Sequence, residues 1–444
     1  MKEPEQVSRR KFIGSSALAG VAASFPYVAK GEELQSDTIR IAAVGLGGRG
    51  SGAVGELLAA PADLEKEKGI KCKTKLVAVA DAFPEKATNK IEALRKRYGD
   101  QVQVEGRIFG GLDGYKQAIN EEVDLVVIAT PPGFKPQQFE YAINQGKKVF
   151  MEKPVASDVI GVRRVLESAK LAKEKGLNVA VGLQRRHEKK FKDSVKQLQD
   201  GVIGDINLLR VYWNGNSIWH KAKQDGMTEM EYQVNNWYHF TWASGDQICE
   251  QHIHNLDVGC WIKGMYPVKA NGMGGSEMRM GGDRTLSQIY DHTFVEYTFE
   301  DGTKMYSQGR HLKGGWSHVA EYAHGSKGTC SVGRFIEPFE GDPIRIEGEK
   351  IRPHYKEQLD LVEALHKGEY YNEADYGAMS TFTAILGREA CYSGKEISAD
   401  ELMKKGRDYA PGIDDYTFST TPPVVPGENG EYPVPAPGVY RPFA

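Results

Sequence analysis

One glycine pattern fixes how this chain begins to fold. Residues Ile39–Gly50 read I-R-I-A-A-V-G-L-G-G-R-G, a run of small and β-branched residues that stops at Gly45, Gly47 and Gly50. These glycines have the spacing G-x-G-x-x-G, and apolar residues follow at helical intervals. A strand, a glycine turn and a helix together form the context in which this pattern predicts a dinucleotide site.

Each glycine of the pattern has a physical task in such a site. Gly45 permits the tight turn, Gly47 lets the backbone approach a pyrophosphate, and Gly50 packs the helix against the strand. The helix N-terminus offers unpaired N–H groups and a partial positive charge to the phosphates. The cofactor contacts predicted from this loop are Gly45, Leu46, Gly47, Gly48, Arg49 and Gly50.

An acidic residue follows the second predicted strand. Lys75–Ala80 (K-L-V-A-V-A) ends at Asp81, and a carboxylate there accepts the ribose hydroxyls of adenosine, which favours NAD and repels a 2′-phosphate. The alternative is that Asp81 caps the helix beginning near Pro84. The nearby Lys86 leaves NADP open.

Strands and helices continue to alternate after Asp81. Strands are predicted at 101–105, 124–130 and 147–151, with helices at 112–120 and 136–145. Repeated β-α-β units with continuously apolar strands predict a parallel sheet covered on both faces. Ligands of such sheets bind beyond the strand C-termini, so Thr130, Pro131, Glu152 and Lys153 join the predicted cofactor site.

Three further motifs point to a family. They are A-T-P-P at Ala129–Pro132, E-K-P at Glu152–Pro154 and G-L-Q-R-R at Gly182–Arg186. With the glycine loop, they resemble the glucose–fructose oxidoreductase / inositol dehydrogenase (Gfo/Idh/MocA) family over residues 38–394. The resemblance implies an α/β Rossmann domain that binds NAD(P), followed by an α+β domain with a large open, mostly antiparallel sheet.

The family carries a D-x-x-x-H pair with a trailing acid on a helix of the second domain. The matching segment is Ile248–Gly264, which places His254 at the histidine and Asp257 at the trailing acid. Glu250 replaces the family aspartate. On one continuous helix, these three residues share a face, so we expect the carboxylate and the imidazole to converge on one substrate carbon.

Hydride transfer from a secondary alcohol needs a base for the hydroxyl proton. We assign His254 as the general acid/base and Lys153 as proton partner and substrate orienter. Glu250 then orients the imidazole, and Arg186 or Asp257 binds hydroxyls. The alternatives are a structural salt bridge for Lys153 and a satisfied core histidine for His254.

A metal site is not expected. His252 and His254 stand two residues apart and point to different faces of a helix, and no cysteine pair has the spacing of zinc ligands.

Aromatic residues precede the His254 helix. Sugars combine apolar C–H faces with hydroxyl edges, so aromatic side chains flanked by amides suit them. Asn235, Trp237 and Tyr238 are the predicted substrate contacts. The alternative is that alternate aromatic residues of this stretch fill the core of the domain.

The N-terminus resembles a twin-arginine export signal. Ser8–Ile13 reads S-R-R-K-F-I and precedes a modest apolar run. We therefore expect residues 1–35 to be a signal peptide read by the twin-arginine export machinery, a periplasmic or otherwise exported location, and no membrane anchor after processing. Free NAD is scarce there, so the cofactor is expected to be tightly bound.

The remaining boundaries follow from these segments. Residues 36–155 are the predicted NAD(P)-binding Rossmann domain. Residues 156–395 form the substrate and oligomerisation domain, with a final helix at 375–393 that returns to the Rossmann domain. Residues 396–444 form an extended Pro-rich arm.

Composition narrows the partners. A net charge of −3 over 444 residues gives no sign of nucleic-acid binding. Five scattered cysteines form no disulfide framework. Because sheets of this family often build subunit contacts with their exposed face, we expect a homodimer or homotetramer.

Three hypotheses about function remain open. The first is an NAD(P)-dependent oxidoreductase acting on a sugar or sugar derivative. The second is a redox-neutral, NAD-dependent glycoside hydrolase that oxidises, eliminates, adds water and reduces on one substrate. The third is a non-catalytic exported sugar sensor.

Overall fold

The computed structural model describes residues 29–30, 36–276, 283 and 285–443. The twin-arginine motif Ser8–Ile13 lies outside the described residues. Of the predicted signal 1–35, only Ala29–Lys30 is described, as strand β1, and it pairs antiparallel with β16 (Glu369–Tyr370).

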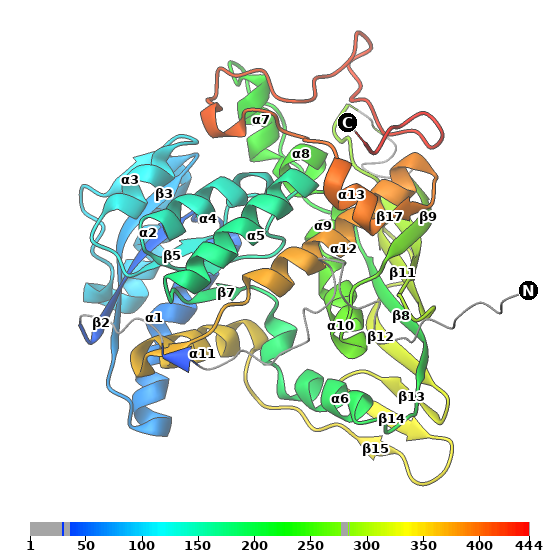
Figure 1. Ribbon diagram of the computed structural model, residues 1–444. Helices are drawn as coiled ribbons and strands as arrows, with labels where there is room; N and C mark the ends of the chain where they lie inside the picture. Colours follow the sequence, from blue (N-terminus) through cyan, green and yellow to red (C-terminus); the bar gives the residue numbers. More distant parts are fainter. Residues whose placement is uncertain (1–28, 31–35, 277–282, 284, 444) are drawn as a thin grey trace, which may run out of the picture.

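The first sheet is parallel throughout and has six strands in the order β4-β3-β2-β5-β6-β7 (Figure 1). This order, with the crossover at β2, is that of a Rossmann fold. Its strands are β2 (Thr38–Val44), β3 (Lys73–Asp81), β4 (Ile108–Gly110), β5 (Leu125–Ile128), β6 (Lys148–Met151) and β7 (Val179–Val181).

Helices cover both faces of this sheet, as the continuously apolar strands predict. Ile41 and Ala43 of β2 pack into the cluster on one face, whereas Ala42 and Val44 pack into the cluster on the other. The first face carries α1 (Gly48–Lys68), α2 (Pro84–Tyr98) and α11 (Pro353–Lys367); the second carries α3 (Gly114–Asn120), α4 (Lys135–Asn144) and α5 (Val159–Glu174).

Two predictions about this sheet need correction. The strand predicted at 101–105 does not form, because Val102 makes only an isolated bridge to Leu76 and a turn at Gly106 follows; the third strand in sequence is β4 instead. The sheet also runs past the predicted boundary at residue 155, since β7 pairs with β6.

The second sheet has nine strands in the order β15-β14-β13-β12-β8-β11-β10-β9-β17. It is antiparallel except between β8 and β11, so the predicted architecture of the second domain is confirmed. Its strands are β8 (Ile206–Gly215), β9 (Lys269–Gly275), β10 (His292–Thr298), β11 (Lys304–His311), β12 (His318–Gly325), β13 (Gly328–Ser331), β14 (Phe335–Pro338), β15 (Ile344–Arg345) and β17 (Ile397–Ser398).

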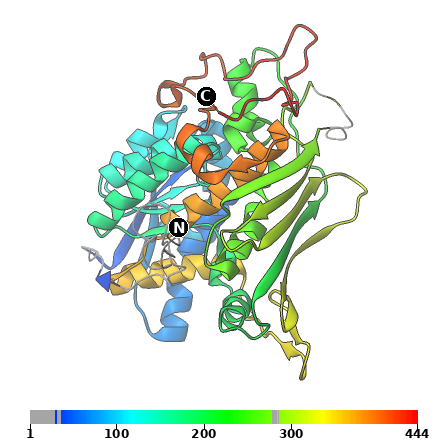
Figure 2. The same cartoon turned by 45° about the vertical axis from the view of Figure 1, so that its right-hand side comes forward.

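Helices pack on one side of this sheet, between it and the Rossmann domain (Figure 2). Its strands alternate accordingly: Val295 and Tyr297 of β10 are fully buried, whereas Phe294 is 41% exposed on the opposite face. The remaining helices are α6 (Lys189–Gln199), α7 (Glu229–Asn235), α8 (Thr241–Ser244), α9 (Gln247–Glu250), α10 (Ile253–Lys263), α12 (Ala374–Ser393) and α13 (Ala399–Lys405).

The prediction has one final helix, 375–393, returning to the Rossmann domain. In the structure, both α11 and α12 contact that domain. α12 lies between the domains, in contact with α5 and β7 on one side and with β9 and β10 on the other. α11 packs on α1, where Leu361 and Leu365 join the hydrophobic cluster of the first sheet. The second domain is therefore anchored to the first through both helices.

The C-terminal segment packs against the rest of the protein (Figure 1). The prediction of an extended arm over residues 396–444 is wrong for its first part, which forms β17 and α13. The described part beyond Gly412 holds one 3-10 turn at Ile413–Asp415. Phe418 stacks on Phe83 with ring centroids 5.3 Å apart, and Tyr432 meets Phe240 at 4.9 Å. The arm and residues 227–243 thus share a third hydrophobic cluster.

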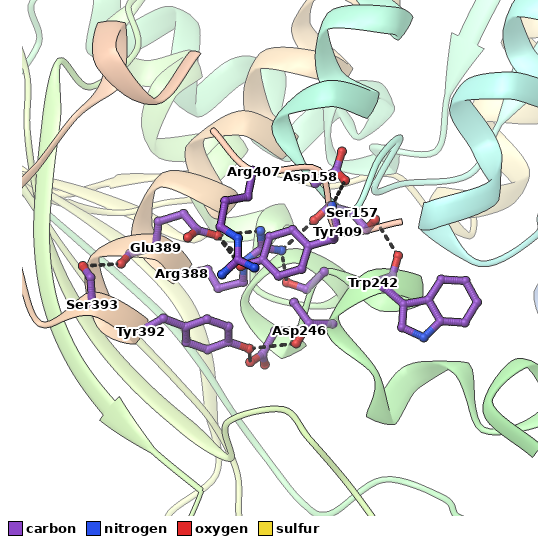
Figure 3. Close-up of polar contacts among 12 residues, drawn as sticks. Ser157, Asp158, Trp242, Asp246, Arg388, Glu389, Tyr392, Ser393, Arg407 and Tyr409 are labelled. Carbon is purple, nitrogen blue, oxygen red and sulfur yellow. Dashed lines mark hydrogen bonds and ion pairs between the residues drawn. The ribbon is translucent and has the colours of Figure 1, made fainter. Parts of the chain in front are cut away.

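A buried arginine joins the arm to the loops around the cleft (Figure 3). Arg388 of α12 is fully buried and donates from Nη1 to the carbonyls of Ser157 (2.6 Å) and Gly245 (3.1 Å). Its guanidinium also bonds Glu389, which accepts from the hydroxyl of Tyr409 at 2.9 Å. One side chain thereby fixes the segment after the E-K-P turn, the loop before α9 and the arm.

All five cysteines are buried and free. Among the described residues, no helix has the length and apolar character needed to cross a membrane.

Candidate active site

The glycine loop has the shape that its spacing predicts. Gly45 adopts φ +86°, and a Cβ there would lie 2.9 Å from backbone atoms of Ala129 and Thr130. A Cβ at Gly50 would lie 2.0 Å from the carbonyl oxygen of Gly45. Only glycine fits at these two positions.

Gly47 and Gly48 differ from Gly45 and Gly50 because they face open space. A Cβ on Gly47 or Gly48 would meet no atom of the described chain within 4 Å. Helix α1 begins at Gly48, and no described side chain caps its N-terminus. The backbone N–H groups there are open to an anion, so the loop fits a pyrophosphate.

Arg49 turns toward carboxylates of its own chain. Its Nη2 lies 2.7 Å from Oε2 of Glu56, and its Nε lies 2.7 Å from Oε1 of Glu152. Burial lowers the pKa of Arg49, but the carboxylates raise it by a larger amount, so the net change is upward. This side chain links the glycine loop to the E-K-P turn.

Asp81 lies at the end of β3 with both oxygens on backbone donors. Oδ2 accepts from the N–H of Leu46 at 2.8 Å, and Oδ1 accepts from Phe83 at 2.9 Å. The second bond lies just before α2, as the capping alternative expects, and the first fixes the carboxylate on the glycine loop. Burial raises the pKa of Asp81.

A pocket opens beside Asp81 at the carboxyl ends of β2, β3 and β5. Apolar side chains dominate it, with polar groups at its rim, which suits a flat heteroaromatic ring such as adenine. Val234 of α7 closes it from the second domain. Its lining is Val44, Ala80, Asp81, Ala82, Gly111, Leu112, Tyr115, Thr130, Pro131, Phe134, Gln138 and Val234.

Lys153, just after β6, and Glu250 of α9 meet where the two domains pack together. The ammonium of Lys153 donates to the backbone carbonyl of Glu250 and lies 3.2 Å from its Oε1. The other carboxylate oxygen, Oε2, is buried with no partner among the described residues. Burial raises the pKa of Glu250, although Lys153 opposes the change.

His254 lies against Trp213 of β8, with ring centroids 5.8 Å apart and an interplanar angle of 28°. Its Nδ1 is buried with no hydrogen-bond partner in the described part of the chain. Burial, followed by the charges of Lys153 and Arg185, lowers the pKa of His254 well below its usual value. The lowered pKa favours the neutral imidazole at pH 7.

The helix predicted to carry both groups is broken. Glu250 ends α9 and His254 lies in α10, with Gln251 and His252 between the two helices. The expectation that Glu250, His254 and Asp257 share one helix face is therefore wrong. Lys153 instead connects the first two, since it bonds Glu250 and its charge acts on His254.

Lys135 belongs to the same site and was missed by the sequence reasoning. Its ammonium is buried and donates to the carbonyl of Pro154 at 2.9 Å and of Lys153 at 3.4 Å. Burial lowers the pKa of Lys135 to about 8. The only sequence signal was its position three residues after the A-T-P-P motif.

Arg186 and Asp257 pair with each other. Arg186 Nε lies 3.0 Å from Oδ2 of Asp257 and Nη2 lies 2.8 Å from Oδ1, which also accepts from Ser380 at 2.7 Å. The guanidinium covers the ring of Tyr376 at 3.9 Å. This closed arrangement favours a structural role over the predicted contact with substrate hydroxyls.

The predicted substrate contacts Asn235, Trp237 and Tyr238 have different surroundings. Trp237 meets Trp219 and Tyr238 at 6.3 Å and 5.5 Å between centroids. Tyr238 is buried and its hydroxyl lies 3.4 Å from Nε2 of His311. Asn235 instead faces the nucleotide side, where its amide oxygen accepts from two lysines.

Within the described ranges, no group of three or more His, Cys, Asp or Glu side chains is arranged to hold a metal ion.

The parallel sheet, the open glycine loop and Asp81 define an NAD-binding Rossmann oxidoreductase. Residues 39–183 match the profile GFO_IDH_MocA, an oxidoreductase family with an NAD-binding Rossmann fold. Over these residues the chain is similar to the Gfo/Idh/MocA oxidoreductases, the family that the sequence motifs resemble.

Relatives extend the comparison into the second domain. The chain is 26% identical over 261 residues to inositol 2-dehydrogenase of Rhizobium meliloti, which covers 58% of this chain and 68% of that enzyme. It is 24% identical over 227 residues to a glycosyl hydrolase family 109 protein of Streptomyces coelicolor, covering 46% and 44%.

The fold matches scyllo-inositol dehydrogenase from Lactobacillus casei, solved with bound NAD(H) and scyllo-inositol. The TM-score is 0.59 at 21% identity, covering 82% of this chain and 99% of that one.

Proposed function

We propose that the chain is an NAD(P)-dependent oxidoreductase that transfers a hydride between the nicotinamide and a hydroxyl of a sugar or sugar derivative. The observation that carries the proposal is the convergence of Lys153, Glu250 and His254 beside the nucleotide site. Both Glu250 and His254 keep a buried polar atom without a partner, and buried polar atoms are normally satisfied. A polyhydroxylated ligand would supply hydrogen-bond partners for both of these atoms.

The chain's own groups divide the proton chemistry. A bound nicotinamide would supply the hydride-acceptor chemistry at the carbinol carbon. His254 takes the hydroxyl proton on its buried Nδ1, which has no hydrogen-bond partner among the described residues. Lys153 holds the substrate oxygen as it becomes a carbonyl, and Glu250 fixes the ammonium through its carboxylate and its carbonyl.

A redox-neutral glycoside hydrolase is the second candidate, and the likeness to a glycosyl hydrolase family 109 protein favours it. In that reaction, oxidation at one carbon acidifies a neighbouring C–H bond. Loss of that proton expels the glycosidic group, water adds to the resulting double bond, and the carbonyl is reduced again. The same lysine and histidine would serve as acid and base.

Two assays on the purified full chain separate these candidates. A dehydrogenase produces NADH absorbance with inositols or free sugars and leaves nitrophenyl glycosides intact. A hydrolase releases nitrophenol with no net change in NADH absorbance. A chain that binds NAD but supports neither reaction across a broad panel would contradict both candidates and favour the sugar sensor.

We further propose that the protein is exported with its cofactor tightly bound. The support is the Ser8–Ile13 motif, since twin-arginine export carries folded proteins. Retention through purification needs a Kd of about 1 nM or below. Denaturing the mature protein should release about one nucleotide per chain; recovery of apoprotein whose activity depends on added NAD would contradict retention.

We propose a homodimer or homotetramer built on the outer face of the second sheet. Phe294, Met273 and Trp316 are 41%, 71% and 60% exposed, and Trp316 stacks on His318. Exposed apolar surface of this kind marks contact sites. Light scattering should show an oligomer that Phe294→Glu dissociates; a monomer at micromolar concentration would contradict the proposal.

A further inference from the structure

Aromatic rings lie in series from the proposed acid/base group toward the surface of the second domain. His254 stacks on Trp213 of β8, with ring centroids 5.8 Å apart. Farther along, Tyr238 meets Trp237 at 5.5 Å between centroids, and Trp237 meets Trp219 at 6.3 Å.

The second sheet connects the two ends of this series. Trp213 and His311 lie on adjacent parallel strands, β8 and β11, two residues out of register. Because alternate residues of paired strands face the same side, both side chains lie on the face of the sheet that carries His254. Tyr238 packs on His311, with ring centroids 5.9 Å apart. The rings therefore follow one face of the sheet outward from His254.

Exposure to solvent increases along the series. His254 and Tyr238 are buried and Trp237 is half-buried, whereas Trp219 is 43% exposed. In the described chain, the ring neighbours of Trp219 are Trp237 and His239, which stand at 63° and 86° to it. Neither is stacked flat on the indole, so Trp219 offers the open aromatic surface at the outer end.

The backbone that carries Trp219 is held in place, although residues 216–228 form neither helix nor strand. Nε2 of His239 lies 2.8 Å from the carbonyl oxygen of Trp219. The backbone N–H of Lys221 donates to Oδ1 of Asn236 at 2.8 Å, and its carbonyl accepts from Nδ2 of the same amide at 2.9 Å. Binding to a fixed ring loses less conformational entropy than binding to a mobile one, so this position suits a ligand.

We propose that Trp219 forms an outer sugar position, so that the substrate is a disaccharide or another glycoside rather than a free monosaccharide. The reacting ring lies at His254, and the second ring stacks on the indole of Trp219. The inference rests on the proposed function for the first ring and adds the class of substrate.

The chemistry around Trp219 fits a pyranose ring. The C–H face of such a ring is apolar and matches an aromatic side chain, while its hydroxyl edges need polar partners. Lys221 supplies a donor, because its ammonium lies over the indole of Trp219, 5.0 Å from the centroid. An apolar plate and a polar group are thus present together.

The test compares kcat/KM of the full chain for sugars that share their non-reducing ring: glucose with cellobiose, galactose with lactose, and N-acetylglucosamine with N,N′-diacetylchitobiose. For a pair that is turned over, the disaccharide should exceed the monosaccharide about tenfold, because one stacked ring contributes about that factor. Trp219→Ala should remove this advantage through KM and leave the monosaccharide within about twofold. Trp219→Phe should keep the advantage. The control Phe339→Ala, at a ring 69% exposed just after β14, should change neither sugar.

Calorimetry with the same sugars gives a readout that does not need turnover, if the chain is loaded with NADH, which cannot accept a hydride. The wild type should bind the disaccharide about tenfold more tightly than the monosaccharide, and Trp219→Ala should bind both alike.

Three results would overturn the inference: no preference for any disaccharide in the wild type, equal weakening of both sugars in Trp219→Ala, or a change of oligomeric state in that variant by light scattering. The last would make Trp219 a subunit contact. Disaccharide binding that depends on Trp219, without turnover of any sugar, would instead support the outer sugar position and contradict the proposed function.

Discussion

Two largely buried ion pairs lie between the Rossmann domain and the second domain, and they are built in opposite ways. Arg186 and Asp257 are joined by several bonds, supported by Ser380 and covered by Tyr376. Lys153 bonds the backbone carbonyl of Glu250 but only one of its two carboxylate oxygens, and the other carboxylate oxygen is buried without a described partner.

This difference is our reason to interpret Arg186 and Asp257 as a structural pair and to propose a catalytic role for Lys153 and Glu250. A buried pair contributes to the fold when all its polar atoms are satisfied. A pair that leaves an atom unsatisfied carries a desolvation cost that a ligand removes. The sequence marked all four residues as site candidates, and only the completeness of their contacts distinguishes them.

The largest expected effect is on Lys153. Lys153→Met should lower kcat about a thousandfold, because positioned acid–base groups contribute about 10² to 10⁴ in rate. The Kd for NAD should change less than about threefold, since the phosphates are held at the glycine loop. Stopped-flow NADH absorbance and calorimetry check both; an active variant would place the chemistry elsewhere.

Asp257→Asn should act on stability. Leaving Arg186 buried without its counter-ion costs about 3 kcal/mol of unfolding free energy, measurable by urea denaturation. Turnover of the folded fraction should stay within about threefold of wild type. A collapse of kcat in fully folded protein would return Asp257 to the substrate site.

Two neighbouring histidines extend the contrast to pH. Nε2 of His252 lies 2.7 Å from the hydroxyl of Ser307, its Nδ1 is buried with no hydrogen-bond partner among the described residues, and burial lowers its pKa to about 3. The unfolded histidine titrates near 6.5, so stability should fall as the pH drops from about 6.5 toward 3, by up to about 1.4 kcal/mol per pH unit.

His252→Gln should flatten that slope by one proton while leaving activity at pH 7 intact. Urea unfolding measured at pH 7, 6 and 5 reports the slope. A variant whose stability falls as steeply as the wild type would show that the imidazole of His252 takes up a proton in the folded state.

The smallest effect is expected where both partners are exposed. Lys196 and Asp200 are 65% and 61% exposed at 2.6 Å, and such pairs contribute less than about 0.5 kcal/mol. Lys196→Met should therefore leave the urea midpoint almost unchanged. A loss comparable to that of Asp257→Asn would show that burial is not what separates these pairs.

Local rules made the nucleotide half readable from the sequence. Gly45 and Gly50 are required by backbone approach within the loop itself, and Asp81 follows from the end of a strand. The break between Glu250 and His254 was not readable, because I-C-E-Q-H-I-H contains neither glycine nor proline.

Contacts between distant segments were equally hidden. Lys135 and Lys221 acquire their positions from the E-K-P turn and from Asn236, which are set only once the domains pack. The alternating Q-V-Q-V-E at 101–105 looks like a strand, yet it meets β3 only in the bridge from Val102 to Leu76, and β4 pairs with the later residues Val79–Asp81.

The third hydrophobic cluster ties the adenosine pocket to the order in which the chain is made. Val234, which closes that pocket, belongs to α7, and α7 is secured from outside by the arm: Gln233 donates to the carbonyl of Val424 at 2.7 Å, and Tyr432 bonds Glu229. Those anchors are synthesised some 190 residues after the helix that they hold. On a ribosome-bound chain that still lacks the arm, α7 has none of these contacts. The pocket that Val234 lines can therefore be completed only after the arm has left the ribosome.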